Sequence, residues 1–568
     1  MKKIGIVGFL VATLVLQAGA QTNPVAAPKK EVYQAVATKT NDLVHTELDA
    51  SFDFSNSTLI GKVKITLHPH HYPTNNLVLD AKGMDIKEVA IVKNGKNVPA
   101  KFLNDGMMLT IQLDKSYVKN ENYTVYISYV AKPNEYKGTG SAAITDAKGL
   151  YFINPLGTEK NKPTQVWTQG ETEGTSVWVP TIDKPNQKST QTFRLKVPAK
   201  FVSLSNGLLT SQVKNNDGTR TDTWEMKQPH APYLFFIGMG DYAVVKDSYK
   251  GKEVSYYVDK EYEKVARKIF GETPAMMEFF SKKLGVEYPW AKYAQMTARD
   301  YVSGAMENTS CTLHGSGVQQ NARELVDGNG WEGTIAHELF HQWFGDYVTC
   351  DNWGDIWLNE GFASYVEQLF VNKFYTPAIA FNYRTAVHNR VMQQAGGTVF
   401  CNDTTDENRI YDSRLTYDKG AAVLHMLRYL APKDSLFFAG IKNYLSAHAF
   451  STATTSDLKA ALSTAYQKNL DTFFNQWVYG EGYPTYSAEW NQQINGSNYD
   501  FVIKLNQTTS MPSSVSAFNL PLPILLRSPQ GDTMLYLPFN TATATYNWPT
   551  NTFTKTISSV EIDPSNWI

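Results

Sequence analysis

Residues 335 to 348, IAHELFHQWFGDYV, contain two histidines four positions apart and a glutamate directly after the first. On a helix, positions i and i+4 lie on the same face, so His337 and His341 can offer two imidazole nitrogens to one ion. Glu338 is offset by about 100° and lies beside such an ion, where a general base for a water molecule belongs. The bare pattern also arises by chance, in which case both histidines would form ordinary hydrogen bonds in a core.

A catalytic zinc site with two histidines needs a third protein ligand and an open fourth position. Glu360 stands 19 positions after His341 (360 − 341), at the start of the apolar-periodic segment DIWLNEGFASYVEQLF. We therefore predict that His337, His341 and Glu360 bind one Zn²⁺ per chain. The competing explanation for Glu360 is a carboxylate that the helix dipole favours at a helix start.

Glu367 lies seven positions after Glu360 and so on the same face of the predicted helix. It is placed to contact a ligand histidine from behind. We favour the alternative, a solvated surface glutamate.

The elements around this segment change along the chain from β to α and back to β. KVKITLH and YTVYISYV alternate apolar and polar residues, and turn residues such as Asn94-Gly95 separate such runs. Helical spacing begins near residue 259 and continues to about residue 480, after which strands return. We predict an α+β multidomain protein: an N-terminal antiparallel β domain at 41–245, a mainly helical catalytic domain at 246–482 and a C-terminal β-sandwich-like module at 483–568.

The first residues, MKKIGIVGFLVATLVLQAGAQ, combine two lysines, an apolar stretch and a small-residue cleavage site. This is typical of a signal peptide at 1–20, followed by a leader or linker at 21–40, so we expect an exported protein, periplasmic or secreted. A membrane anchor is the alternative, but residues 4–16 fall short of the about 20 that a span needs. We expect no integral membrane span after signal cleavage.

The composition excludes some partners. The 568 residues carry a formal net charge of −1, which removes the general electrostatic case for binding nucleic acid or an anionic membrane. Three cysteines are an odd number, so pairing would leave at least one thiol. No pattern indicates the oligomeric state.

Four sequence blocks occur in a characteristic order: WTQGETEG at 167–174, GAMEN at 304–308, the histidine segment with NEGF at 359–362, and YDKGAAV at 417–423. Together they resemble the gluzincin zinc aminopeptidases, the family of aminopeptidase N and leukotriene hydrolase, over nearly all of the mature chain. The resemblance implies a thermolysin-like catalytic domain and peptide substrates with a free N-terminus. Larger members carry a helical C-terminal domain over the site; without one, we expect a more open cleft or one that a partner subunit covers.

The GAMEN block supplies the predicted substrate-binding strand. The resemblance implies that Gly304, Ala305 and Met306 pair with an extended peptide as an edge strand, while Glu307 binds its α-ammonium group. Thr309 stands where the family often has an aromatic residue, which puts the side-chain preference in question.

The resemblance also assigns the block at 167–174. Glu171 matches a second ammonium-binding carboxylate, with Gln169 in the same or a supporting role; leukotriene hydrolase has an amide in place of the carboxylate. Two carboxylates that converge on one amine favour exopeptidase action, because an internal peptide bond would leave both unpaired at a cost of several kcal/mol.

Tyr417 matches the family tyrosine that donates to the oxyanion of the tetrahedral intermediate. The assignment depends on the following Lys419-Gly420, since Tyr411 lies only six residues upstream. With Glu338 as general base, the chain is then a zinc aminopeptidase. The alternatives are a zinc endopeptidase, a catalytically inactive peptide-binding relative, and a hydrolase of small molecules like leukotriene hydrolase.

Overall fold

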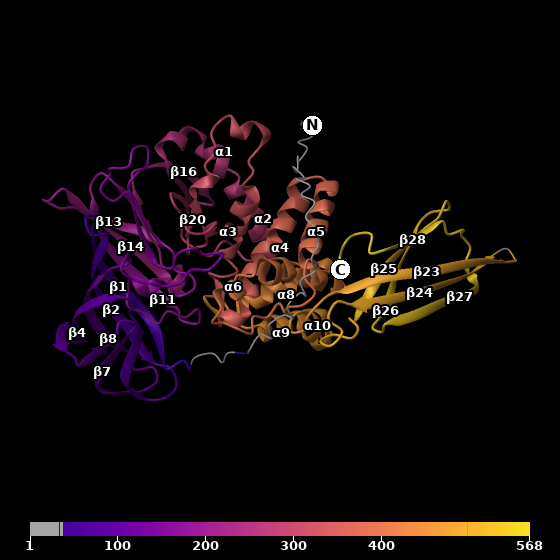
Figure 1. The fold of residues 1–568 in the computed structure, drawn as a ribbon, viewed down its shortest axis with the longest axis horizontal. Coiled ribbons are helices and arrows are strands. Elements are labelled where there is room, and N and C mark those ends of the chain that lie inside the picture. The colour runs from indigo at the N-terminus through magenta and orange to yellow at the C-terminus, as the bar shows by residue number, and fades with distance from the viewer. Residues whose placement is uncertain (1–32, 34–37, 497) are drawn as a thin grey trace, which may run out of the picture.

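The fold, taken from a computed structural model, runs from a β-rich end through a helical middle to a second β-rich end (Figure 1). The structure describes residue 33 and residues 38–496 and 498–568. The predicted signal peptide and most of the predicted leader lie outside these residues and stay predictions. The predicted domain boundaries also stay predictions; the one at 245/246 falls within strand β16 (Tyr242–Tyr249).

The N-terminal region contains an eight-stranded sheet with the order β13-β14-β11-β1-β2-β8-β4-β5, and smaller sheets of four and three strands. Alternation along β2 buries Val63, Ile65 and Leu67 completely, as the sequence predicts. The predicted antiparallel arrangement holds except between β1 and β11, which pair in parallel. The strands are β1 (Asn41–Asp53), β2 (Thr58–Pro69), β3 (Thr74–Asp80), β4 (Met84–Lys93), β5 (Lys96–Pro99), β6 (Phe102–Asn104), β7 (Met108–Tyr117), β8 (Tyr123–Ala131), β9 (Leu150–Ile153), β10 (Gln165–Thr168), β11 (Ser189–Pro198), β12 (Val202–Ser205), β13 (Leu208–Lys214), β14 (Thr219–His230) and β15 (Ile237–Gly240).

A five-stranded sheet with the order β16-β17-β18-β20-β19 carries the GAMEN block at one edge. Among the strands of the described residues, β19 pairs antiparallel with β20 alone, which leaves its other side open. Such an edge presents unpaired backbone groups that can bind another chain. The remaining strands of this sheet are β17 (Lys252–Asp259), β18 (Tyr293–Ala298), β19 (Ala305–Met306) and β20 (Cys311–Gly315).

Helices make up most of the middle region, and large buried aromatic residues such as Trp343 and Trp357 fill its core. A short parallel pair, β21 (Val348–Cys350) and β22 (Ser451–Ala453), also lies here. The helices are α1 (Ala266–Phe270), α2 (Thr273–Leu284), α3 (Glu332–His341), α4 (Trp357–Phe374), α5 (Pro377–Val391), α6 (Glu407–Ile410), the π-helical segment Ser413–Lys419, α7 (Gly420–Leu430), α8 (Asp434–Ala447), α9 (Thr455–Tyr466) and α10 (Asp471–Trp477).

Two glycines let α4 and α7 approach each other closely. A methyl group at Gly361 would lie 3.1 Å from Gly420 Cα, so any side chain there presses on backbone. Gly361 follows Glu360, and Gly420 directly follows the segment Ser413–Lys419 that carries Tyr417. The close helix contact therefore places these two candidate site residues next to each other.

Gly361→Val should lower the free energy of unfolding by about 1–3 kcal/mol, the usual cost of overfilling a packed contact. Chemical denaturation would measure the change. Ser364→Val on the same helix is the control. It introduces the same β-branched side chain at a position that is only half-buried. Equal stability of both variants would contradict the close helix contact.

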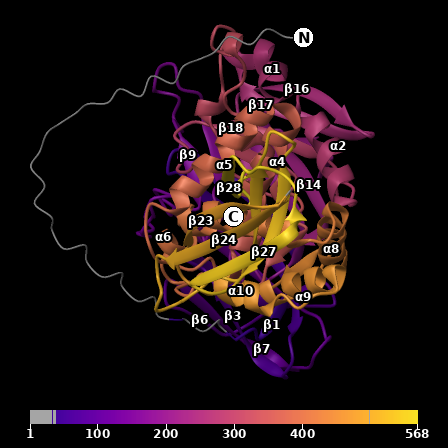
Figure 2. The same cartoon turned by 90° about the vertical axis from the view of Figure 1, so that its right-hand side faces the viewer.

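The C-terminal region is a sandwich of two three-stranded sheets, β23-β24-β27 and β26-β25-β28, and Figure 2 shows its strands in front of the helices. Phe501, Ile503 and Leu505 alternate along β24 and are completely buried between the sheets. The sandwich confirms the predicted β module. Its strands are β23 (Pro484–Asn495), β24 (Asn498–Thr509), β25 (Leu520–Arg527), β26 (Thr533–Phe539), β27 (Thr543–Phe553) and β28 (Ser559–Ile562).

Two further observations concern the described residues as a whole. Cys311, Cys350 and Cys401 are buried thiols rather than disulfide partners. We find no helix within these residues whose length and apolar character would let it span a bilayer.

Candidate active site

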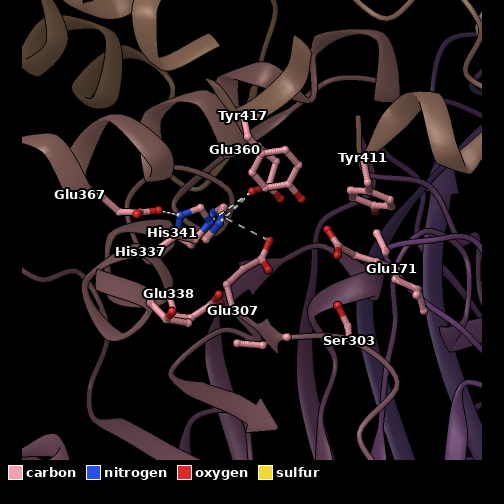
Figure 3. A pocket seen from close by; sticks show the side chains of 15 residues that line it. Glu171, Ser303, Glu307, His337, Glu338, His341, Glu360, Glu367, Tyr411 and Tyr417 are labelled. Carbon is pink, nitrogen blue, oxygen red and sulfur yellow. Dashed lines mark hydrogen bonds and ion pairs between the residues drawn. The ribbon is translucent and has the colours of Figure 1, made fainter. Parts of the chain in front are cut away.

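A cavity of about 260 Å³ brings together most of the predicted site residues (Figure 3). Its walls come from the β-rich N-terminal region, the edge of the five-stranded sheet and the helices α3 and α4. The lining residues are Ala143, Ile144, Glu171, Ser303, Gly304, Ala305, Glu307, Thr334, His337, Glu338, His341, Glu360, Glu367, Tyr411 and Tyr417.

His337 and His341 lie on one face of α3, and Glu360 reaches them from the first turn of α4. The distance from Glu360 Oε2 is 3.4 Å to Nε2 of His337 and 3.3 Å to Nε2 of His341. The three ligand atoms lie within 4.8 Å of one another. The structure thus assembles a group of two imidazoles and one carboxylate that could hold a metal ion.

The outer nitrogens of both rings are occupied, which orients the inner ones. Nδ1 of His337 lies 2.9 Å from Glu367 Oε1, and Nδ1 of His341 lies 2.9 Å from the backbone oxygen of Phe344. Both Nδ1 atoms are then placed to donate, which leaves each Nε2 as the ring nitrogen available to a cation between the rings and Glu360, as in metal-binding histidines. The donor set fits a metal. Our preference for Glu367 as a solvated surface residue was wrong, since its carboxylate supports a candidate ligand.

Burial and charge act against each other at these groups. Burial lowers the pKa of His341, but the nearby carboxylates of Glu307 and Glu360 outweigh it and raise the pKa to about 10. Burial raises the pKa of Glu360, but the two histidines outweigh burial and lower the pKa to about 2. The negative potential that favours a proton on these rings also favours a divalent cation between them.

Glu338 points into the cavity from α3 and is 6% exposed. Burial raises the pKa of this carboxyl to about 8, although both neighbouring histidines oppose the shift. Its Oε2 atom has no hydrogen-bond partner in the described part of the chain. An unpaired carboxyl that titrates near neutral pH is suited to accept and return a proton.

Glu307 and Glu171 face each other across the same cavity (Figure 3), and carboxylate oxygens of both lie within 4.8 Å of one from Glu360. Burial raises the pKa of Glu171 well above its ordinary value, and the charge of Glu307 adds to the shift. Each carboxyl has one buried oxygen, Oε1, without a hydrogen-bond partner among the residues described, although Glu307 Oε1 lies 3.9 Å from Nδ1 of His341. Such a pair is poised to bind a cationic group.

The edge strand borders the cavity, but not every residue that was predicted to bind substrate lines it. Gly304 and Ala305 line the cavity, with open space above Gly304. The Met306 side chain instead packs in the core. Gln169 is also buried away from the cavity, because it accepts a hydrogen bond from Tyr301 and donates one to Met306 Sδ. The structure therefore favours the supporting role for Gln169, one of the two that the sequence left open. The predicted pairing of Gly304, Ala305 and Met306 with a peptide involves the backbone, and it stays a prediction.

Tyr417 and Tyr411 occupy different ends of the cavity (Figure 3). Tyr417 is close to Glu360 and stacks on His337 with ring centroids 6.2 Å apart, whereas Tyr411 is close to Glu171. Burial raises the pKa of the Tyr417 hydroxyl well above 10, so it stays a hydrogen-bond donor. Tyr417 lies in the π-helical segment, a conformation that is frequent at functional sites.

Sequence reasoning missed several lining residues. Ser303 precedes the GAMEN block, and its side chain points toward Glu171 (Figure 3). Ala143, Ile144 and Thr334 also line the cavity. Residues 143 and 144 lie in a loop without a motif, so no local signal marks them. For Ser303, its position directly before Gly304 of the GAMEN block was a local signal.

Comparison with known families agrees with this arrangement. The peptidase family M1 domain matches residues 269–477, and the peptidase M1 N-terminal domain matches residues 38–234. The chain belongs to peptidase family M1. The family assignment confirms the predicted resemblance, and the two matched segments correspond to the helical and N-terminal β regions of this M1 chain.

Individual relatives of this M1 chain are longer than it is. Human glutamyl aminopeptidase is 28% identical over 61% of the chain and 37% of the human protein. The glutamyl aminopeptidase of Sus scrofa is 26% identical over 85% of the chain and 51% of the relative. The chain thus spans about a third to a half of the length of these relatives.

One solved structure supports the fold of this M1 chain. The crystal structure of Legionella pneumophila aminopeptidase A in complex with aspartic acid superposes with a TM-score of 0.75. It covers 93% of this chain and 59% of the Legionella chain at 17% identity. The likeness confirms the multidomain α+β architecture.

Proposed function

We propose that this chain is a zinc-dependent aminopeptidase that removes the first residue from peptides. The observation that carries the proposal is one cavity holding a two-histidine, one-glutamate donor set beside two buried carboxyls, each with one oxygen that has no hydrogen-bond partner among the described residues. The family assignment and the names of the relatives support the same reaction. The peptide amine is the cation that the carboxylates would bind.

His337, His341 and Glu360 would hold the zinc. Two imidazoles and one carboxylate form a donor set that suits zinc in a hydrolytic site. When bound, zinc supplies Lewis acidity, which polarises the scissile carbonyl and makes water more acidic.

The surrounding residues carry out the proton transfers and stabilise charge. Glu338 takes a proton from the attacking water molecule and passes it to the leaving amine, a task that fits a carboxyl facing the cavity with one oxygen that has no hydrogen-bond partner among the described residues. Tyr417 donates its hydroxyl hydrogen to the oxygen on which negative charge develops. Both side chains reach the cavity from rigid helical segments, which holds them in place before the substrate arrives.

The substrate would lie along β19 with its N-terminus toward Glu307 and Glu171. Backbone pairing fixes an extended peptide, and the two carboxylates then bind only a chain that starts there with an ammonium group. Because the carboxylates and the donor set share one small cavity, a single residue fits between the amine and the scissile bond.

An N-acetylation test distinguishes this proposal from an endopeptidase. Amides of Leu, Glu, Arg and Ala with free amines should be hydrolysed about 10²–10³-fold faster than their N-acetyl forms, because losing one partner of a buried ion pair costs about 3–5 kcal/mol. Values of kcat/KM would measure the ratio. Glu171→Gln should reduce the ratio while the acetylated substrates react at an unchanged rate. Equal rates on blocked and free substrates would instead establish the endopeptidase.

We also propose that the protein is exported. The support comes from the sequence of residues 1–20, with its two lysines, apolar stretch and Ala-Gly-Ala end. The expected mature chain begins at Gln21, in the periplasm or the medium.

A further inference from the structure

Helix α5 is peripheral in its packing but adjoins the active site. Of its residues Pro377–Val391, only Ala380, Val387 and Val391 are buried. Two long polar side chains, Tyr383 and Arg390, stand seven positions apart and therefore on one face of the helix. Both point to residues that adjoin the candidate catalytic groups.

Tyr383 completes a chain of hydrogen bonds to a candidate metal ligand. Its hydroxyl donates to Glu367 Oε2 at 2.9 Å, while Glu367 Oε1 lies 2.9 Å from Nδ1 of His337. The two oxygens of Glu367 thus hold one partner each. With Tyr383 in place, the carboxylate cannot rotate without breaking one of these bonds, so the ring of His337 is fixed as well.

Arg390 makes the corresponding contact next to Tyr417. Its Nε and Nη2 atoms donate to the two oxygens of Asp418 at 2.8 Å and 2.7 Å. Asp418 is the neighbour of Tyr417 in the π-helical segment, and its side chain is 14% exposed. A paired, planar Arg–carboxylate contact fixes direction as well as distance, which a single-point contact does not.

We propose that α5 is a positioning helix: Tyr383 orients the metal ligand His337 through Glu367, and Arg390 orients the oxyanion donor Tyr417 through Asp418. Neither residue lines the catalytic cavity in the described structure, so they are positioning residues and not catalytic ones. The role of Tyr383 requires only that the donor set binds zinc, whereas the role of Arg390 rests on the proposed function.

Zinc affinity tests the first contact. Tyr383→Phe should raise the zinc Kd by about tenfold. Loss of a residue that hydrogen-bonds to a metal ligand typically weakens metal affinity about 10–100-fold, and we expect the lower end of that range. Competition with a chromophoric chelator on the metal-depleted full chain would measure it. Tyr375→Phe is the matched control, because the Tyr375 hydroxyl also donates at 2.9 Å to a glutamate, Glu332, which lines no part of the cavity.

Turnover tests the second contact. Arg390→Met should lower kcat about tenfold, while KM and zinc affinity stay unchanged. This loss is smaller than the about 10²-fold drop in rate that a 1 Å misplacement of a reacting group can cause. Arg390→Lys keeps the charge but loses the paired contact, and should fall between the wild type and Arg390→Met. Arg384→Met is the control on the same helix, since Arg384 bonds only to Asn372 among the hydrogen bonds of the described residues.

The outcomes separate this inference from the proposed function. A wild-type protein that binds no zinc would overturn the proposed function itself. Normal zinc binding by the wild type together with an unchanged Kd in Tyr383→Phe would overturn the positioning role of Tyr383 alone. An Arg390→Met variant that loses kcat no more than Arg384→Met would do the same for Arg390, and thermal unfolding of each variant would identify any loss caused by misfolding.

Discussion

Replacing Glu338 by glutamine is expected to lower turnover by about 10³-fold, within the about 10²–10⁴-fold that general acid–base catalysis contributes. Glutamine fills the same space but cannot take a proton from water. Glu338 does not belong to the donor set of His337, His341 and Glu360, so the variant should still contain one zinc ion per chain. Turnover of a free-amine substrate and the metal content of the purified variant would be measured together.

Glu332→Gln supplies the control for this prediction. Glu332 lies on the same helix, and its carboxylate accepts a hydrogen bond from Tyr375 away from the cavity. Its replacement should leave turnover nearly unchanged. Full activity in Glu338→Gln would remove Glu338 from the role of base, and loss of zinc from that variant would show that it supports the metal instead.

Tyr417→Phe should lower kcat by about 10²–10³-fold with little change in KM, because the lost hydroxyl stabilises charge that develops only in the transition state. The ring, which stacks on His337, would remain, so the metal donor set should be undisturbed. Steady-state kinetics on free-amine substrates would separate kcat from KM.

Tyr411→Phe tests whether the two tyrosines have been assigned correctly. The Tyr411 hydroxyl is buried without a hydrogen-bond partner in the described chain and lies at the Glu171 end of the cavity. Its loss should therefore affect KM more than kcat. A large loss of kcat in Tyr411→Phe, with Tyr417→Phe unaffected, would reverse the two roles.

The donor set could be predicted because its signal is local. Helical geometry relates His337 to His341, and Glu360 follows only 19 positions later (360 − 341), at the start of the next helix. By contrast, Glu171 and Glu307 are 136 positions apart (307 − 171), so spacing alone does not bring them together. Their convergence followed from the family resemblance, and the structure shows it as geometry.

What the sequence left open or gave wrongly concerns the direction of side chains. Gln169 and Met306 lie on segments that border the cavity, yet each turns into the core, where it contacts the other. Glu367 was assigned to solvent because exposed glutamates are common, and only the packing of α4 against α3 brings it to His337. Tertiary contacts decide such directions, and no pattern within a few residues records them.

Strand positions could be predicted, but their partners could not. Alternation along 62–68 and 123–130 reports burial of one face and is the same whichever way the neighbouring strand runs. The parallel pairing of β1 with β11 joins His45 to Thr190 across 145 positions (190 − 45), beyond the reach of any turn signal.

The open edge at β19 limits what the proposed enzyme can digest. A strand pairs only with another extended backbone, so an amino terminus that is wound into a helix or paired in a sheet must first come loose. The rate of hydrolysis then depends on how often the N-terminus of the substrate protein unfolds locally. It falls about tenfold for each 1.4 kcal/mol of free energy that this local unfolding costs. Short oligopeptides and proteins with unstructured N-termini would be hydrolysed first, while proteins with folded N-termini would be hydrolysed slowly.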